Sequence, residues 1–308
     1  KKKLEARYIK NSDAALDELL VNDENLRKVL DKQQELQNQR NTISKNLSFE
    51  KDKTGDSFKK LSKEVSDIKN EISSLEAEVV KFQNAINNTL FSLPNIPLDE
   101  VPVAKDDSGN KEIKKSGSIK TYDFKPLSHE VLAKNLDLID FETAANMSGS
   151  RFVILKRDLA KLERALINFM IDVHTNDNSY DEYNVPILVN EKSMFGTGQL
   201  PKFKDEQFQT NNNLWLIPTS EVSLTNMVAD KIVKYEDLPL RFVACTPCFR
   251  LEAGAAGKDT QGMMRQHQFS KVELVSIVQP EFRAEELERL LSSAEKILDL
   301  LKLPYRVM

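Results

Sequence analysis

The sequence predicts an α+β protein in which an antiparallel coiled-coil helical hairpin precedes a domain built around an antiparallel β-sheet. Three observations lead to this prediction: a heptad pattern of apolar residues near the start of the chain, prolines that end it, and strand-like runs with amphipathic helices thereafter. Heptads are typical of paired helices, and strands that come in runs beside helices favour an α+β domain.

The composition agrees with two domains. A chain of 308 residues is long enough for one larger core and a smaller module. No stretch approaches the roughly 20 apolar residues of a membrane helix, and the lysine-rich start lacks the apolar core of a signal peptide. We therefore expect a soluble, cytoplasmic protein with no membrane partner. Because the sequence starts without Met and stops at Met308 within a strand-like run, both ends look cut.

A seam of apolar residues predicts the second helix of the hairpin. Its members are spaced alternately three and four residues apart, as in a coiled coil: Phe58, Leu61, Val65, Ile68, Ile72, Leu75, Val79, Phe82 and Ile86. Residues 26–47 keep the same spacing, with polar breaks at Gln33 and Arg40, before the turn-forming residues 51–56. Two helices joined by so short a connection form an antiparallel hairpin, whose second helix would be about 50 Å long.

Basic residues gather around the expected tip of this hairpin. Residues 40–63 contain seven Lys or Arg against three Asp or Glu, whereas the whole chain has a net charge of -4. The basic residues are Arg40, Lys45, Lys51, Lys53, Lys59, Lys60 and Lys63. Such a surplus suits a phosphate backbone, which predicts a nucleic-acid-binding tip. The heptad pattern taken alone also describes a dimerisation or spacer rod.

Prolines mark the predicted domain boundary. The run Leu93-Pro-Asn-Ile-Pro97 stops any helix, which divides the chain into an arm of residues 1–93 and a domain of residues 94–308. Residues 105–117 are polar and typical of a hairpin. Beyond them, the patterns predict helices at 152–174 and 285–303 and strands at 215–217, 241–252 and 267–278.

Two features resemble common sites without matching them. Cys245 and Cys248 have C-x-x-C spacing, but no second pair completes a zinc shell, and on a strand they would point to opposite faces. We interpret them as packing residues. The segment Gly254-Ala-Ala-Gly-Lys-Asp-Thr260 fails the spacing of a phosphate-binding loop, so we interpret it as a long polar loop between two strands.

One face of this strand hairpin gathers residues suited to a nucleotide. Arg250 and Glu252 are two residues apart on one strand, and Phe269 and Glu273 are four apart on the other, so each pair shares a face. Arg binds phosphate, a carboxylate accepts from an amine, and an aromatic ring stacks on a base. From spacing alone, an exposed polar face with a chance ion pair explains the pattern equally well.

The same segment resembles the second signature motif of class II aminoacyl-tRNA synthetases, in the form of the bacterial-type seryl-tRNA synthetases. The runs that carry the similarity are Thr246-Pro-Cys-Phe-Arg-Leu-Glu-Ala-Gly254 and Arg265-Gln-His-Gln-Phe-Ser-Lys-Val-Glu273. The similarity covers nearly the whole chain, through Gly149-Ser-Arg-Phe152, Met194-Phe-Gly-Thr-Gly-Gln-Leu-Pro-Lys-Phe203, Leu216-Ile-Pro-Thr-Ser-Glu-Val222 and Leu93-Pro-Asn-Ile-Pro97.

The resemblance implies a fold and a role for each matching residue. The domain would have the class II catalytic fold, with Arg250 as the catalytic residue that grips the α-phosphate of ATP. Glu252 would contact the adenine amine, Phe269 would stack on adenine and Arg265 would hold the terminal phosphates. The implied ATP-binding set is Arg250, Leu251, Glu252, Arg265 and Phe269, and the implied serine-binding set is Thr219, Ser220, Glu221 and Glu273. ATP and Mg²⁺ are the implied cofactors, with no protein metal site in this stretch.

The resemblance also implies partners and a reaction. The expected function is ATP-dependent activation of L-serine and its transfer to tRNA(Ser), extended to selenocysteine tRNA. The 152–174 helix and the following strand would form a homodimer. The alternative is a synthetase-like relative that aminoacylates a carrier protein or acts only as a regulatory binding module.

Three departures from the family pattern bear on these expectations. Ser220 replaces the usual alanine, and Arg157 stands where the family commonly has glycine. The third class II motif, which supplies a further arginine for the triphosphate, would lie beyond Met308. We therefore expect the chain as given to be unable to complete the reaction.

Overall fold

The computed structural model describes residues 1–9, 11–50, 53, 55–252 and 262–308. It contains two compact units, Lys1–Lys111 and Glu112–Met308, each with a core of its own. The predicted loop at 254–260 and the predicted tip residue Lys51 lie outside the described residues. Among the described residues, no helix combines the length and apolar character needed to cross a membrane.

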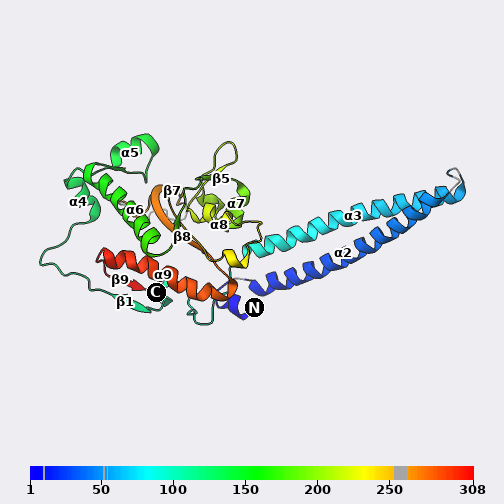
Figure 1. Cartoon of the computed structure of the whole chain (residues 1–308), viewed down its shortest axis with the longest axis horizontal. Helices are drawn as coiled ribbons and strands as arrows, with labels where there is room; N and C mark the ends of the chain where they lie inside the picture. The colour runs from blue at the N-terminus through cyan, green and yellow to red at the C-terminus, as the bar shows by residue number, and fades with distance from the viewer. Residues whose placement is uncertain (10, 51–52, 54, 253–261) are drawn as a thin grey trace. The chain divides into compact units, whose positions relative to one another are not determined.

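The first unit is a helical hairpin that follows the predicted heptad seam. After the short helix α1 (Lys2–Glu5), α2 (Ser12–Phe49) and α3 (Asp56–Ser92) run side by side, as Figure 1 shows. Leu36 of α2 packs against Ile68, Ile72 and Leu75 of α3. An ion pair of 2.6 Å between Lys32 and Glu71 also joins the two helices. Because every predicted seam position of α3 is buried or half-buried, the coiled-coil prediction is confirmed.

The chain beyond α3 packs back on the start of the same unit. Arg7 donates to the carbonyl oxygen of Asn95 over 2.6 Å, and Lys3 pairs with Asp99 at 2.7 Å. These contacts explain why the compact unit extends to Lys111, although its last long helix ends at Ser92.

The second unit is organised around a three-stranded sheet in the order β4-β7-β8. The long strands β7 (Leu240–Phe249) and β8 (Gln268–Ile277) are antiparallel, with Leu240 opposite Ile277 and Phe249 opposite Gln268. The short β4 (Asp181–Glu182) pairs with β7 in parallel. The α+β prediction with an antiparallel strand hairpin is therefore confirmed, with one parallel strand added at its edge.

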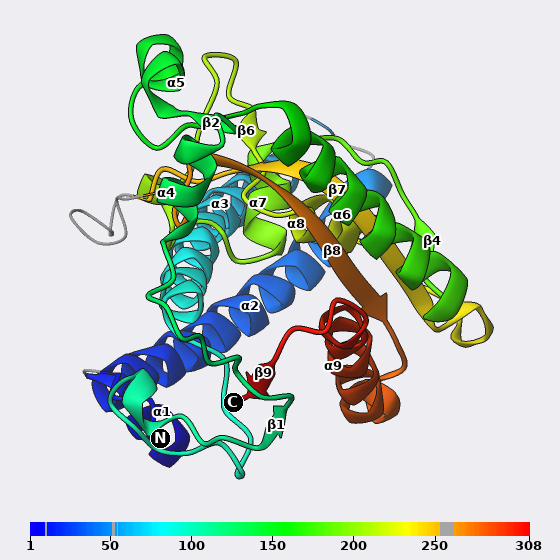
Figure 2. The same ribbon diagram turned by 90° about the vertical axis from the view of Figure 1, so that its left-hand side faces the viewer.

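Alternate residues of β7 and β8 enter two different cores. Phe242, Ala244 and Val275 pack against Leu224 of α8 (Glu221–Asn226), whereas Val243 packs against Ile171 of α6 (Arg157–Asp177). Figure 2 shows α6 and α8 on opposite sides of the strand pair.

The alternation of side chains along β7 also separates the two free cysteines. Cys245 joins the α6 side and Cys248 is fully buried beside Thr246, as their interpretation as packing residues requires.

The prediction for the start of α6 was wrong, because residues before it form a strand. β3 (Ile154–Leu155) pairs with β2 (Ile139–Asp140), so the helix begins at Arg157 instead of Phe152. Arg157 has a φ angle of 51°, in the left-handed region that favours glycine. The family's glycine therefore has a conformational reason, and Arg157 departs from it under backbone strain.

Helix α9 (Arg283–Leu300) is tied to the sheet by buried charges. The guanidinium of Arg241 on β7 donates two hydrogen bonds of 2.8 Å to the carboxylate of Glu286, and Arg289 pairs with the same carboxylate at 2.7 Å. The hydrogen bonds from Arg241, followed by those from Arg289, lower the pKa of Glu286 from 4.5 to about 2 against the opposing effect of burial.

The segment 105–117 does not form the predicted hairpin. Instead β1 (Lys114–Ser116) pairs with the distant β9 (Tyr305–Val307), which local sequence could not indicate. A smaller core contains Met194, Trp215, Ile217 and Val222. The described part of this unit also contains α4 (His129–Asn135), α5 (Phe141–Ser148), β5 (Leu188–Val189), α7 (Glu191–Gly196), η2 (Lys204–Glu206), β6 (Trp215–Leu216), η3 (Tyr235–Asp237) and η5 (Pro280–Phe282).

Candidate active site

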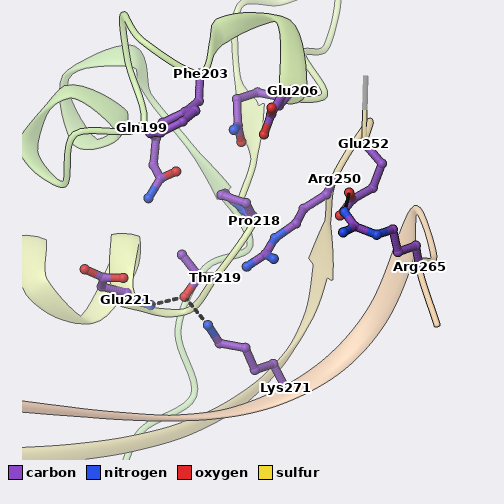
Figure 3. Close-up of a pocket in the computed structure, with 11 residues that line it drawn as sticks. Gln199, Phe203, Glu206, Pro218, Thr219, Glu221, Arg250, Glu252, Arg265 and Lys271 are labelled. Carbon is purple, nitrogen blue, oxygen red and sulfur yellow. Dashed lines mark hydrogen bonds and ion pairs between the residues drawn. The ribbon is translucent and has the colours of Figure 1, made fainter. Parts of the chain in front are cut away.

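A cavity of about 580 Å³ opens in the second unit where the end of β7 meets the loop before α8. Figure 3 shows the residues that line it, which come from several separate segments. They are Gln199, Phe203, Glu206, Gln207, Pro218, Thr219, Glu221, Arg250, Glu252, Arg265 and Lys271. Five of the predicted site residues are among them: Thr219, Glu221, Arg250, Glu252 and Arg265.

Arg250 directly follows the last residue of β7, and its side chain projects into this cavity (Figure 3). Its main chain is held on both sides by His267: the Arg250 amide donates to the His267 carbonyl over 3.0 Å, and Nδ1 of His267 lies 2.8 Å from the Arg250 carbonyl oxygen. The guanidinium carbon lies 5.2 Å from the centre of the Phe269 ring. A fixed main chain and a ring beside it restrict the guanidinium, as binding of a phosphate in a defined place requires.

Glu252 reaches the cavity by a different route from the predicted one. The strand ends at Phe249, so the prediction of a strand to Glu252 was wrong, and Glu252 has a φ angle of 49°. Leu251 between them donates its amide to the Glu206 carbonyl over 2.9 Å, which turns the chain. Glu252 then pairs with Arg265 at 3.0 Å. Arg250 and Glu252 share the cavity because of this turn and not because of strand periodicity.

Thr219 is the centre of a small polar cluster at the floor of the cavity. Its hydroxyl donates to the carboxylate of Glu273, and it accepts hydrogen bonds from Nζ of Lys271 over 2.8 Å and from the Glu221 amide over 3.3 Å. Lys271 and Glu273 also form an ion pair. Phe269, Lys271 and Glu273 share one face of β8, since they are two residues apart in succession.

The electrostatics of this floor are those of two neighbouring carboxylates. Burial, and then the negative charge of Glu273, raises the pKa of Glu221, while the positive charge of Lys271 opposes the rise. A cationic or hydrogen-bond-donating ligand would find two acceptor groups here, Glu221 and Glu273, on either side of Thr219.

Ser220 is placed differently from the other three members of the predicted serine-binding set. Its side chain is fully buried, and its hydroxyl lies 2.7 Å from that of Thr246 on β7. The hydroxyl that replaces the family's alanine methyl therefore faces the core and finds a partner there. Ser220 fastens the Thr219–Glu221 loop to the sheet rather than lining the cavity.

Sequence reasoning missed Lys271 and the wall formed by Gln199, Phe203, Glu206 and Gln207. The position of Lys271 between Phe269 and Glu273 on one strand face was a signal that could have found it. The wall residues come from a segment with no regular period, and only the fold brings them to β7.

The predicted basic tip lies in the first unit. Arg40 and Lys45 are in α2, Lys59, Lys60 and Lys63 are in α3, and Lys53 lies between the two helices. All are exposed except the half-buried Arg40. Within the described part of the chain, no group of three or more His, Cys, Asp or Glu residues is arranged to hold a metal ion.

Comparison with known proteins gives these observations a class. A family model for the class II core domain of tRNA synthetases (G, H, P, S and T) matches residues 202–308, which include β7, β8 and most of the cavity. A model for the seryl-tRNA synthetase N-terminal domain matches residues 1–97, which include the helical hairpin. The fold is that of a class II aminoacyl-tRNA synthetase.

The sequences of relatives narrow this class to one family. The chain is 50% identical over 279 residues to the serine--tRNA ligase of Ehrlichia canis, covering 89% of this chain and 64% of that protein. It is 48% identical over 291 residues to the serine--tRNA ligase of Sinorhizobium fredii, covering 94% of this chain and 68% of that protein. The chain belongs to the seryl-tRNA synthetase family, and it spans about two thirds of the length of these relatives.

Solved structures agree with the assignment. The seryl-tRNA synthetase from Pyrococcus horikoshii, complexed with ATP, matches with a TM-score of 0.88 at 32% identity over 99% of this chain and 72% of that one. The cytoplasmic serine-tRNA ligase from Naegleria fowleri, in complex with AMP, matches with a TM-score of 0.83 at 25% identity over 99% and 69%.

Proposed function

We propose that the protein to which this chain belongs activates L-serine with ATP and transfers the seryl group to tRNA(Ser). The observation that carries the proposal is the guanidinium of Arg250 in a 580 Å³ cavity that also holds Thr219 and Glu221. A phosphate-binding cation beside a hydroxyl and a carboxylate is the pairing that a nucleotide and an amino acid would need. The serine--tRNA ligases among the relatives and the ATP complex of the Pyrococcus protein support it.

The reaction would take place in two steps. The serine carboxylate attacks the α-phosphorus of ATP, which forms seryl-adenylate and releases pyrophosphate. A terminal hydroxyl of the tRNA then attacks the seryl carbonyl and AMP leaves. No protein nucleophile is required, so catalysis comes from positioning and from charge stabilisation by Arg250.

ATP would bind along the end of β7 and the start of β8. In this proposal Arg250 holds the α-phosphate, Phe269 stacks on adenine, and Leu251 and Glu252 form the edge that contacts the adenine amine. Arg265, which pairs with Glu252 at 3.0 Å, would turn to the terminal phosphates. Mg²⁺ would enter with ATP and neutralise phosphate charge, and we assign no residue of this chain as its ligand.

Serine would bind on the floor of the cavity. Glu221, Glu273 and Thr219 offer acceptors and a hydroxyl for the ammonium and side-chain hydroxyl of the substrate, and Ser220 contributes by holding their loop. A site built to hydrogen-bond a hydroxyl discriminates strongly against alanine, because the buried polar groups would stay without a partner.

The arm, taken as residues 1–93, would bind tRNA through its basic tip, and residues 94–308 would carry the chemistry. Phosphate contacts by exposed lysines suit the backbone of a structured RNA. Replacing Lys59, Lys60 and Lys63 together by Ala should weaken tRNA binding. The plot of the logarithm of the binding constant against the logarithm of the salt concentration should become less steep, its negative slope shrinking by about two. The same slope with full affinity would exclude the tip as the binding site.

The proposal also covers the oligomeric state, the cellular location and the tRNAs that accept serine. We propose a cytoplasmic homodimer formed through α6 and the strand after it, with selenocysteine tRNA as a second acceptor. Sedimentation of the intact protein tests the dimer, and charging of the two transcribed tRNAs tests the range of acceptors.

Serine-dependent exchange of pyrophosphate into ATP tests the central proposal. The intact protein is assayed with serine and, separately, with alanine, threonine and cysteine. Exchange with serine and little with the other three is expected. A folded protein that exchanges with none of them would refute the proposal and favour the non-canonical relative that acts as a binding module.

A further inference from the structure

Lys271 occupies a central place on the cavity floor, and the proposed reaction gives it no role. Its Nζ atom lies 2.8 Å from the hydroxyl oxygen of Thr219 and forms an ion pair with Glu273. Its side chain is 31% exposed and that of Glu273 is 19% exposed, so the ion pair is shielded from water on most sides. Figure 3 shows the lysine reaching to Thr219 from β8.

The hydrogen bonds of Thr219 have only one consistent direction. A threonine hydroxyl has one proton and two lone pairs, and an ammonium can only donate. Since Lys271 donates to Thr219, as does the Glu221 amide, the hydroxyl proton goes to Glu273. Glu273 therefore accepts a hydrogen bond from Thr219 and forms an ion pair with Lys271, so both neighbours hold its carboxylate in place.

Without a cation, this floor would hold two carboxylates close to each other. Glu273 raises the pKa of Glu221 and Lys271 opposes that rise. Two carboxylates in one site repel each other, and a neighbouring ammonium offsets that repulsion. Other charged or titratable groups around the cavity are Arg250, Glu252, Arg265, Glu206 in η2 and the buried Cys248 on β7.

We propose that Lys271 is a positioning residue that determines specificity for a hydroxyl-bearing amino acid. Its ammonium pairs with the Glu273 carboxylate and donates to Thr219, which fixes both side chains so that Glu273 can accept a hydrogen bond from the substrate hydroxyl. The inference rests on the proposed serine activation and adds to it the residue that positions the carboxylate proposed to bind the substrate hydroxyl.

The test compares Lys271→Met with Lys271→Arg and with Lys204→Met, a control that makes the same change at an exposed lysine of η2. Pyrophosphate exchange is measured on the intact protein with serine and ATP varied separately, with alanine as competitor. A sulfamoyl analogue of seryl-adenylate and its alanyl counterpart provide a binding measurement by calorimetry that needs no turnover.

For Lys271→Met we expect the KM for serine to rise at least about 10-fold, because the half-buried Glu273 carboxylate loses its charged partner. The KM for ATP should stay within about threefold, since the hydrogen bond and the ion pair of the lysine go to Thr219 and Glu273, which belong to the proposed serine-binding set. The preference for the seryl over the alanyl analogue should fall about 10-fold. Lys271→Arg should recover most of the serine affinity, and Lys204→Met should match the wild type.

Two results would overturn the inference. One is an unchanged KM for serine and an unchanged preference for the seryl analogue in Lys271→Met. The other is an equal rise of the KM values for serine and ATP, which indicates a purely structural role. In either case serine-dependent exchange by the wild type leaves the proposed function intact. Absence of that exchange in the wild type would refute the function and the inference together.

Discussion

The helical hairpin α2–α3 and the strand hairpin β7–β8 both fold a long stretch of chain back on itself, but they use sequence information differently. In the helical hairpin, one seam of apolar residues at heptad spacing makes α3 a helix and also determines which of its faces packs on α2. In the strand hairpin, each strand serves two cores, and its chemistry depends on distant residues such as Thr219, 52 positions from Lys271. A periodic element can therefore be changed at one seam position without affecting chemistry, whereas the site depends on contacts that no period describes.

The largest expected effect is a loss of activity at the strand hairpin without a loss of stability. Arg250→Ala should lower the rate of serine-dependent pyrophosphate exchange by about 10³-fold, because a positioned cation that stabilises transition-state charge is lost. Thermal unfolding should change little. Arg283→Ala, at the exposed start of α9, is the control and should keep full exchange. Exchange by Arg250→Ala at a near-normal rate would contradict the assignment of the cavity.

A substitution in the apolar seam should destabilise the helical hairpin and leave serine activation unchanged. Ile72 is 5% exposed within the seam, so Ile72→Ala should cost the hairpin about 2 to 4 kcal/mol. Hydrogen exchange of the α2 and α3 amides should speed up, while pyrophosphate exchange is unaffected. Val80→Ala, on the exposed side of α3 at 58%, should cost less than about 0.5 kcal/mol. Equal effects of the two changes would mean that the seam does not hold the hairpin.

The buried charges behind the sheet predict a pH dependence. Glu286 has a pKa of about 2 in the folded chain, against 4.5 ordinarily, so it stabilises the fold above pH 4.5 and this contribution disappears as the pH falls toward 2. Glu286→Gln should therefore cost about 2 kcal/mol at pH 7, and the difference from the wild type should shrink below pH 4.5. Urea unfolding from pH 3 to 7 measures it. A difference that is constant over this range would exclude a role for the carboxylate charge.

The smallest expected effect concerns a single dihedral angle. Arg157 has a φ of 51°, so Arg157→Gly should stabilise the second unit by about 1 kcal/mol through relief of strain. The exposed ion pair with Asp137 at 3.1 Å contributes little. Arg157→Ala loses the same ion pair but keeps the strain, and it should be no more stable than the wild type in the same urea experiment. A glycine variant no more stable than the alanine variant would mean that the backbone angle is not strained.

Much of the architecture could be predicted from the sequence because it follows local periods. The heptad seam, the prolines after α3 and the alternation along β8 correctly indicated the hairpin, the end of its second helix and the common face of Phe269 and Glu273. The errors lie where a distant segment intervenes. Residues 154–155 pair as β3 with β2, so α6 begins later than predicted. Residues 114–116 pair as β1 with β9 and therefore do not form the predicted polar hairpin.

The sequence by itself determined that this chain folds as a helical arm and an α+β domain, and it identified the strand hairpin that carries Arg250. Only the tertiary structure decided that Lys271 meets Thr219 and Glu273, that the hydroxyl of Ser220 turns to Thr246 and that Glu252 enters the cavity by a turn. The physical reason is that periodicity reports which side of an element is apolar. The pairing of polar groups from separate segments depends instead on how those segments pack, since each buried donor and acceptor takes the partner that the fold brings within reach.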